Sequence, residues 1–427
     1  MENITAILFP LAIALFAGLL MTRLCKPLGL PAVTGYLVAG ILIGPFCLGR
    51  FGVTGLGFTS IENVEHFSIV SEVALGFIAF TIGNEFRLSS LKKIGKQAFA
   101  IAIFGALVAT LFVDGALIAM SFIMPGSVDL PIALTLGAIA AATAPAATLM
   151  VIRQYKAKGP VTEMLLPVVA IDDAVGLIIF AVSIGVAKAI NTNQLDVLSI
   201  AVEPLLEIVL SLIIGGIMGA LLSYTERLFH SRSKRLSITV AFVLLAVAIS
   251  QMKFSIGAVH IGFSPLLLLM MMGTVFCNMC DFSEELMDRL DRWTAPLFAL
   301  FFVISGAELQ LEVFADITMV IIGIVYIVFR CLGKYVGAGA SAKITRCDSK
   351  VVKYLGITLF PQAGVALGMT LVAMNEIGGT QADTIRNITL FSVMIYELVG
   401  PLLTKIALTK AGEIIPEHRK SNRGIIN

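Results

Sequence analysis

Two adjacent aspartates, Asp172 and Asp173, lie within the apolar stretch "PVVAIDDAVGLIIF" at residues 167–180. An aspartate at the centre of a bilayer costs about 2.5 to 3.5 kcal/mol on insertion scales, and two neighbouring carboxylates also repel each other. Ionisable residues at that depth are functional by default. Adjacent helical residues point about 100° apart, so one carboxylate can face a water-filled cavity while the other meets a protein partner. The alternative is a buried, hydrogen-bonded pair with a structural role.

Two further apolar segments, "ATAPAATLM" and "FPQAGVALGM", are interrupted by proline near the middle of their predicted spans. Proline removes an amide donor and clashes with the preceding turn, which leaves carbonyl groups unpaired. Such backbone is tolerated at membrane depth only within protein or along a water-filled cavity, where carbonyls and hydroxyls suit a hard monovalent cation. The alternative is a kink used for packing. The candidate residues are Thr143, Ala144, Pro145, Thr148, Pro361, Gln362 and Gly364.

Two cationic residues, Arg330 and Lys334, are spaced i, i+4 in "FRCLGKYVGAGA" and therefore share one helix face. Arg330 lies deep in its apolar segment, so we expect it to pair with a buried carboxylate. The available partners are Asp172, Asp173 and Glu397. We expect the ammonium of Lys334 to extend to the cytoplasmic surface, with a charge-balancing role as the alternative. Glu397 is expected either to pair with Arg330 or to be structural.

The elements that must position these residues are membrane helices. Hydrophobic residues make up 58% of the 427-residue chain and charged residues only 14%, against roughly 25% charged in a soluble domain. The apolar blocks are about twenty residues long, which spans a hydrocarbon core of roughly 30 Å. We predict an all-α polytopic membrane protein with about thirteen spans. The predicted spans are 5–24, 31–47, 65–86, 97–123, 130–152, 163–189, 199–224, 235–251, 257–277, 294–312, 316–338, 351–374 and 385–409.

The loops between these segments alternate in charge. One set is rich in lysine and arginine, as in "RLSSLKKIGK" and "ERLFHSRSKR", whereas the other set, as in "NTNQLD", carries almost none. Basic loops stay cytoplasmic, so we predict a multi-pass protein of the cell membrane with its N-terminus outside and its C-terminus inside. An odd number of spans agrees with that orientation.

An internal repeat relates the two halves of the chain. It aligns Gly83 with Gly306 and Asp173 with Glu397. The matching segments are "AFTIGNEFRL" (79–88) with "FVISGAELQL" (302–311), "IDDAVG" (171–176) with "IYELVG" (395–400), and the surroundings of Pro145 with those of Pro361. Each pair lies an odd number of spans apart, so the copies have inverted topology, which is typical of secondary transporters whose sites lie near the midplane where interrupted helices cross.

The repeat predicts the domain organisation. We expect a first repeat at 1–195, a linker helix at 196–228, a second, inverted repeat at 229–410 and a short cytoplasmic tail at 411–427.

Several function classes find no support in the sequence. "CNMC" is a lone CxxC without a second pair, so zinc is not expected. There is no P-loop and no HExxH motif, and the basic residues are spread over short loops, so neither an enzyme nor a nucleic-acid-binding protein is expected. No cofactor is implied.

On "IDDAVG" and the two proline-interrupted segments, the chain resembles the monovalent cation/proton antiporter superfamily, which has the sodium/proton exchanger fold. It is most similar to the bacterial members with an aspartate pair, and the resemblance covers nearly the whole chain. "TIGNEFRLSSLKK" (81–93) and "APLFALFFVISGAEL" (295–309) also look like helices of that family.

The resemblance implies roles for particular residues. Asp173 would bind cation or proton, and Asp172 would be its neighbour, which in electrogenic members pairs with a lysine on the tenth helix. Here the tenth predicted helix contains no lysine, and Arg330 would take over the charge balancing. Family members are homodimers.

These observations predict exchange of a monovalent cation for protons, because both ions compete for one buried carboxylate. Na+ or Li+ suits a site of one or two carboxylates with backbone oxygens. A K+/H+ antiporter is the main alternative, followed by a sodium-coupled solute symporter and a cation channel.

Overall fold

Helices form along most of the chain because backbone in hydrocarbon must satisfy its own hydrogen bonds. The structure, a computed structural model, describes residues 4–28, 30, 32–53, 57–84, 86–88, 95–126, 128–144, 148, 151–152, 155–191, 203–252, 254–256, 259–311 and 315–414. Of the residues singled out above, Pro145 lies outside this described part, as do the predicted domain boundary at 195/196 and residues 415–427 of the tail.

The prediction of an all-α membrane protein is confirmed, with one short β-hairpin added. The longer helices are α1 (Ile4–Cys25), α2 (Ala32–Ile43), α4 (Ser68–Asn84), α6 (Lys96–Ile123), α7 (Leu130–Ala140), α9 (Pro160–Asn191), α10 (Glu203–Arg227), α11 (Arg232–Ser250), α12 (Pro265–Met279), α13 (Ser283–Ala307), α14 (Ile317–Ile344), α15 (Ser349–Thr358), α16 (Gly364–Ile377) and α17 (Gly379–Lys410). The short elements are α3 (Ile61–Glu65), two 3-10 turns (Lys26–Leu28 and Leu48–Phe51), β1 (Phe254–Ile256) and β2 (Val259–Ile261).

Eight helices in the described part of the chain are long and apolar enough to cross a membrane, and α4, α7, α12 and α16 are shorter apolar helices. The predicted span 294–312 overlaps α13, which begins earlier, at Ser283, and ends earlier, at Ala307. Its first turns are charged and held by i, i+4 pairs, Glu285 with Arg289 at 2.8 Å and Asp288 with Arg292 at 2.6 Å.

The predicted span beginning at residue 257 is wrong in its first part. β1 and β2 pair antiparallel there, and helix α12 begins only at Pro265. Proline favours the first helical position because it has no amide to satisfy, and Ser264 caps the helix by accepting from the amide of Leu267. The β-branched residues that precede Ser264, namely Ile256, Val259 and Ile261, favour a strand.

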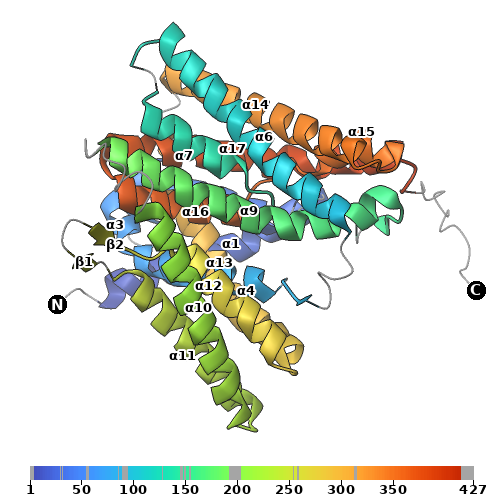
Figure 1. Ribbon diagram of the computed structural model, residues 1–427. Coiled ribbons are helices and arrows are strands. Elements are labelled where there is room, and N and C mark those ends of the chain that lie inside the picture. Colours follow the sequence, from blue (N-terminus) through green and yellow to red (C-terminus); the bar gives the residue numbers. More distant parts are fainter. Residues whose placement is uncertain are drawn as a thin grey trace, which may run out of the picture.

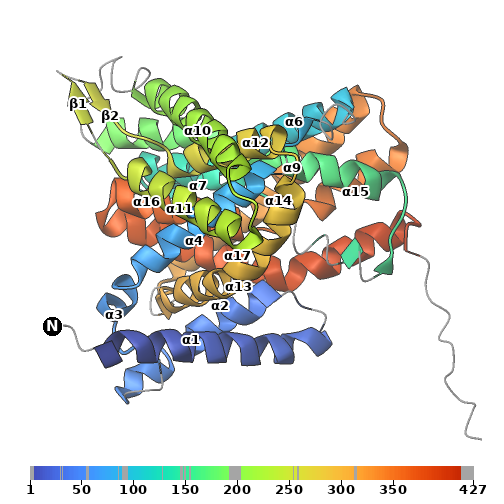
Figure 2. The same ribbon diagram turned by 90° about the horizontal axis from the view of Figure 1, so that it is seen from below.

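The helices form two bundles that contact each other less than their members do internally (Figure 1). We call α6, α7, α9 and α14 to α17 the site bundle, because they carry the candidate residues. We call α1, α2, α4 and α10 to α13 the flanking bundle. Seen from below, α1 lies along one edge of the molecule, next to α2 (Figure 2).

Close helix contacts within the flanking bundle follow the internal repeat. A Cβ added to Gly306 of α13 would lie 2.2 Å from the carbonyl oxygen of Leu37, beside Gly40 of α2. In the other copy, a Cβ on Gly83 of α4 would lie 2.1 Å from the carbonyl oxygen of Met270, beside Gly273 of α12. Glycine permits such backbone approach between membrane helices, so the aligned glycines do the same work in both copies.

We predict that Gly306→Val lowers the stability of the purified protein by about 1–3 kcal/mol, because the new methyl groups meet backbone that cannot move aside. Gly115→Ala is the matched control, since a Cβ at Gly115 would meet nothing within 4 Å. Melting temperatures in detergent test this, and equal values for the two variants would contradict the contact.

Candidate functional site

The aspartate pair lies at the centre of the site bundle. Asp172 and Asp173 belong to α9 and are 1% and 2% exposed. Helix α9 packs against α6, α7, α15 and α16, so the neighbouring helices cover it at this level. The pair is therefore enclosed by protein and does not face lipid.

Asp172 forms an ion pair with Lys334. The ammonium Nζ of Lys334 lies 2.6 Å from Asp172 Oδ2 and also donates to the carbonyl of Ala141 at 2.5 Å. The hydroxyl of Thr143 donates to the same Oδ2 at 2.5 Å. Lys334 is fully buried, so the expectation that it extends to the cytoplasmic surface is wrong. Burying an ammonium costs several kcal/mol unless an anion pairs with it, and Asp172 is that anion.

Arg330 binds carbonyl oxygens, which corrects the expectation of a carboxylate partner. Its Nε donates to Ala140 at 3.0 Å, Nη2 to Ala142 at 2.6 Å and Nη1 to Phe360 at 2.6 Å. Helix α7 ends at Ala140 and α15 at Thr358, so the carbonyls around these ends lack intrahelical donors and carry partial negative charge. One guanidinium thus fastens two helix ends.

The two interrupted segments cross at Ala144 and Pro361. The amide of Ala144 donates to the carbonyl of Pro361 at 2.8 Å, and the hydroxyl of Thr148 donates to the carbonyl of Thr358 at 3.1 Å. Pro361 therefore acts as an acceptor at the crossing, while Gly364 is the first residue of α16. The crossing predicted from the inverted repeat is present.

Gln362 completes the end of α7. Its side-chain Nε2 donates to the carbonyl of Ile139 at 2.8 Å, and Tyr326 of α14 lies within hydrogen-bond distance of both its Oε1 (3.3 Å) and its Nε2 (3.1 Å). The carbonyls of residues 139 to 142 are thus all bound by side chains from elsewhere in the chain. The two residues of this segment predicted to bind the cation, Thr143 and Ala144, follow directly after these carbonyls.

Glu397 is buried in α17 but does not pair with Arg330. It lies at the boundary between the bundles, where the hydroxyl of Thr34 in α2 is 3.5 Å from its backbone carbonyl. Within the described part of the chain, no lysine or arginine forms an ion pair with it. The aligned positions Asp173 and Glu397 are both buried.

Sequence reasoning missed the aromatic lining of the site. Tyr326, Arg330 and Lys334 recur every four residues and lie on one face of α14. The guanidinium of Arg330 also stacks on the ring of Tyr396, 4.6 Å from its centroid. Three polar residues at this spacing in an apolar helix were the available signal.

A second missed contact holds the start of α9. The carboxylate of Glu413 accepts from the amides of Val161 and Thr162 at 2.7 and 2.9 Å, and from the hydroxyl of Thr162 at 2.7 Å. A carboxylate is favoured at a helix N-terminus, where the amides lack partners. Glu413 and Ile414 are buried, so the packed structure extends four residues past the predicted boundary at 410.

Comparison with known proteins assigns the chain to a family. The family model for the sodium/hydrogen exchanger transmembrane region matches residues 11–410. The chain belongs to the sodium/hydrogen exchanger family. The exchanger also resembles the sodium proton antiporter MjNhaP1 from Methanocaldococcus jannaschii at pH 8, with a TM-score of 0.69, 20% identity, and coverage of 96% of this chain and 99% of that one. A map of the same antiporter from electron microscopy gives a TM-score of 0.70, 18% identity, and coverage of 98% and 100%.

At these identities the structural likeness shows a shared fold. The match to the family model confirms the resemblance stated from the sequence. The family identifies the exchanger as a transporter of cations and protons. Within its described residues there is no cluster of three or more His, Cys, Asp or Glu side chains that would hold a metal ion. A monovalent cation is in any case cargo and requires fewer charges than a resident metal.

We predict that Arg330→Lys destabilises the exchanger by about 2–4 kcal/mol. The three carbonyls that Arg330 binds lie near the ends of two different helices, and a single ammonium group cannot reach all three. The matched control is Arg292→Lys, whose side chain is 78% exposed. Thermal unfolding in detergent provides the measurement. An Arg330→Lys variant as stable as the control would mean that the bonds to α7 and α15 are dispensable.

Proposed function

We propose that this protein exchanges Na+ or Li+ for protons across the cell membrane by alternating access, with Asp173 as the carboxylate that binds either ion. The observation that carries the proposal is the division of the buried aspartate pair. Lys334 and Thr143 bind one oxygen of Asp172, which makes Asp172 the charge-balanced member. We assign exchange to its neighbour Asp173, which lies one residue further along α9 and is also buried.

Competition at one carboxylate is sufficient for coupling. A proton or a cation neutralises Asp173, whereas the bare carboxylate is too costly to carry through an apolar surrounding. If the site bundle moves only when Asp173 is neutralised, each inward step of one ion requires an outward step of the other. The limited contact between the two bundles supports such a movement.

The Asp172–Lys334 pair bears on stoichiometry. The lysine that the tenth predicted helix lacks is supplied by α14, so the salt bridge of electrogenic relatives is available here. A cation that enters next to Asp173 also attracts Asp172, which weakens the hold on Lys334. We propose that Lys334 then releases its proton, so that two protons move for each cation.

Orientation and assembly complete the proposal. We place the N-terminus outside the cell and the C-terminus in the cytoplasm, from the charge of the loops. The apolar side chains that α1 leaves exposed, such as Phe16 at 70% and Leu20 at 65%, suit lipid or a second copy of the chain, and we propose a homodimer.

We predict that Asp173→Asn reduces exchange to the level of protein-free liposomes without loss of folding. Purified protein in proteoliposomes with a pH-sensitive dye, challenged in turn with Na+, Li+ and K+, provides the measurement and also separates a sodium from a potassium exchanger. Asp281→Asn, at an exposed position between α12 and α13, is the matched control and keeps the wild-type rate. Cation-driven pH recovery in Asp173→Asn would refute the assignment, and cation flux without proton movement in the wild type would indicate a channel.

We predict that the exchange rate of the wild type responds to an imposed membrane potential. This response should be lost when Lys334 is replaced by a residue that cannot carry the second proton. Lys334→Gln alone leaves Asp172 buried without its counter-ion, at about 3–5 kcal/mol. The informative variant is therefore Asp172→Asn with Lys334→Gln, which is neutral and keeps a hydrogen bond. Persistent voltage dependence in this double variant would exclude Lys334 as the second proton carrier.

A further inference from the structure

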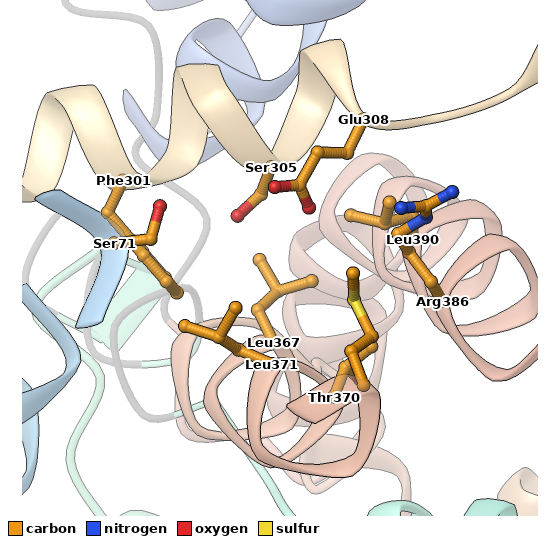
Figure 3. Close-up of a pocket in the computed structure, with 10 residues that line it drawn as sticks. Ser71, Phe301, Ser305, Glu308, Leu367, Thr370, Leu371, Arg386 and Leu390 are labelled. Carbon is orange, nitrogen blue, oxygen red and sulfur yellow. The ribbon is translucent and has the colours of Figure 1, made fainter. Parts of the chain in front are cut away.

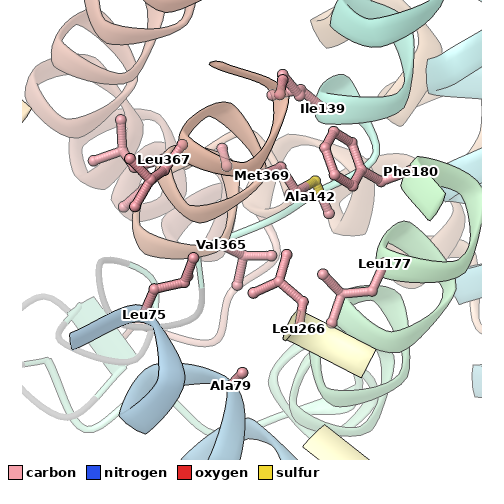
Figure 4. Packing of buried hydrophobic residues seen from close by; sticks show 14 of the residues in the cluster. Leu75, Ala79, Ile139, Ala142, Leu177, Phe180, Leu266, Val365, Leu367 and Met369 are labelled. Atoms are coloured by element: carbon pink, nitrogen blue, oxygen red, sulfur yellow. The ribbon is translucent and has the colours of Figure 1, made fainter. Parts of the chain in front are cut away.

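The boundary between the two bundles has an apolar middle and a polar end. In the middle, Leu75 of α4 and Leu266 of α12 meet Val365 of α16 and Leu177 of α9 (Figure 4). Such contacts have no directional preference, so one bundle can slide over the other with little change in energy. Directional interactions are concentrated elsewhere on the boundary.

At the end where α13 finishes and α17 begins, two hydrogen-bonded pairs connect the bundles, and a third pair of polar residues lines a cavity between them. Asn375 of α16 donates to Glu72 of α4 at 3.3 Å. About two turns into α17, Asn387 accepts from the backbone amide of Gln310 at 3.1 Å and donates to the side chain of Gln310 at 3.4 Å. The third pair, formed by two buried charges, faces across a small cavity.

That cavity is lined by Glu308, Ser305 and Ser71 from the flanking bundle, and by Arg386 and Thr370 from the site bundle (Figure 3). Its volume of about 10 Å³ is close to the minimum for one water molecule. Glu308 is 8% exposed and Arg386 2%. Figure 3 shows the carboxylate of Glu308 directed into the cavity beside Ser305, with the guanidinium of Arg386 on another side of the same cavity.

The chemistry of the cavity argues against a second cation site. A carboxylate and hydroxyls would suit Na+. The guanidinium of Arg386 lines the same cavity, however, and would repel a cation there. Arg386 is itself held by Asp383 of its own helix, through a 2.7 Å bond to a side chain that is 50% exposed. Its charge therefore remains beside the boundary, available to Glu308 of the opposite bundle.

We propose that Glu72–Asn375, Gln310–Asn387 and Glu308–Arg386 form a latch that holds this end of the bundle boundary closed, and that the latch opens and closes in every transport cycle. The proposal rests on the alternating access proposed above. A further contact between the bundles places the hydroxyl of Thr34 3.5 Å from the carbonyl of Glu397. Breaking the latch removes directional contacts that favour this arrangement.

The first test is the accessibility of the cavity. In a background with the native cysteines replaced by serine, Ser305→Cys in proteoliposomes is treated with a membrane-impermeant thiol reagent. Adding Asn387→Ala removes two hydrogen bonds worth about 1 kcal/mol each, so we expect labelling to accelerate about tenfold or more. Glu308→Gln should act in the same direction. Unchanged labelling in both variants would overturn the latch.

The matched control is Gln381→Ala. Gln381 accepts from Asn191 at 2.7 Å at the same end of the molecule, but both residues belong to the site bundle. Its loss should leave labelling of Ser305→Cys at the background rate. Acceleration equal to that of Asn387→Ala would show that the end of the molecule is merely loosened, and would overturn the latch.

The second test fixes the latch in place. Ser305→Cys with Thr370→Cys places one thiol from each bundle on the cavity, and a short bifunctional thiol reagent should join them and stop exchange, with recovery after reduction. Each single-cysteine protein should keep exchanging after the same treatment. Full exchange by the cross-linked protein would contradict the proposal. Thiol labelling does not depend on transport. A wild-type protein that fails to exchange ions would therefore refute the proposed function, and the labelling experiment would still test the latch separately.

Discussion

The whole arrangement depends on how two helices can end inside a membrane protein. The ends of α7 and α15 present carbonyl groups to an interior without water, and each unsatisfied group would cost several kcal/mol. Arg330, Lys334 and Gln362 provide the donors, and the amide of Ala144 bonds across to Pro361. The interruption is stable only because cationic side chains from α14 reach it. Conversely, these buried cations are tolerated because helix ends concentrate negative potential there.

The two cations of α14 are compensated in different ways. Carbonyl oxygens and the ring of Tyr396 surround Arg330, whereas Lys334 takes Asp172 as a full counter-charge. With Asp173 included, the two buried carboxylates of α9 match the two cations in formal charge. In the proposed exchange, the two aspartates are chemically identical and differ in role by their position along α9.

Much of the fold could be predicted from the sequence, because apolar length and loop charge are local properties. The aspartate pair, the interrupted helices and their crossing follow from residue types that are costly in a membrane unless they serve a purpose. The partners of the charged residues could not be predicted. Lys334 looked close enough to a helix end to reach water, and only the packing of α6 against α14 shows that this end is covered. Arg330 was expected to need a carboxylate because sequence shows charged groups but not the dipoles of helix ends. Glu413 was assigned to a tail, since a single capping contact between residues 252 positions apart leaves no periodic signal.

That capping contact has a mechanical consequence. Glu413 follows the last helix of the site bundle and accepts hydrogen bonds from the first turn of α9. The two ends of the chain segment from Val161 to Glu413 are therefore bonded to each other. Shear between α9 and α17 must rupture these bonds before the two helices can slip past each other. A load applied at one helix is therefore shared by the other, and the bundle is stiffened against distortion at the end opposite the latch. In the proposed transport cycle, stiffness of this kind would let the site bundle move without distorting the buried charges at its centre.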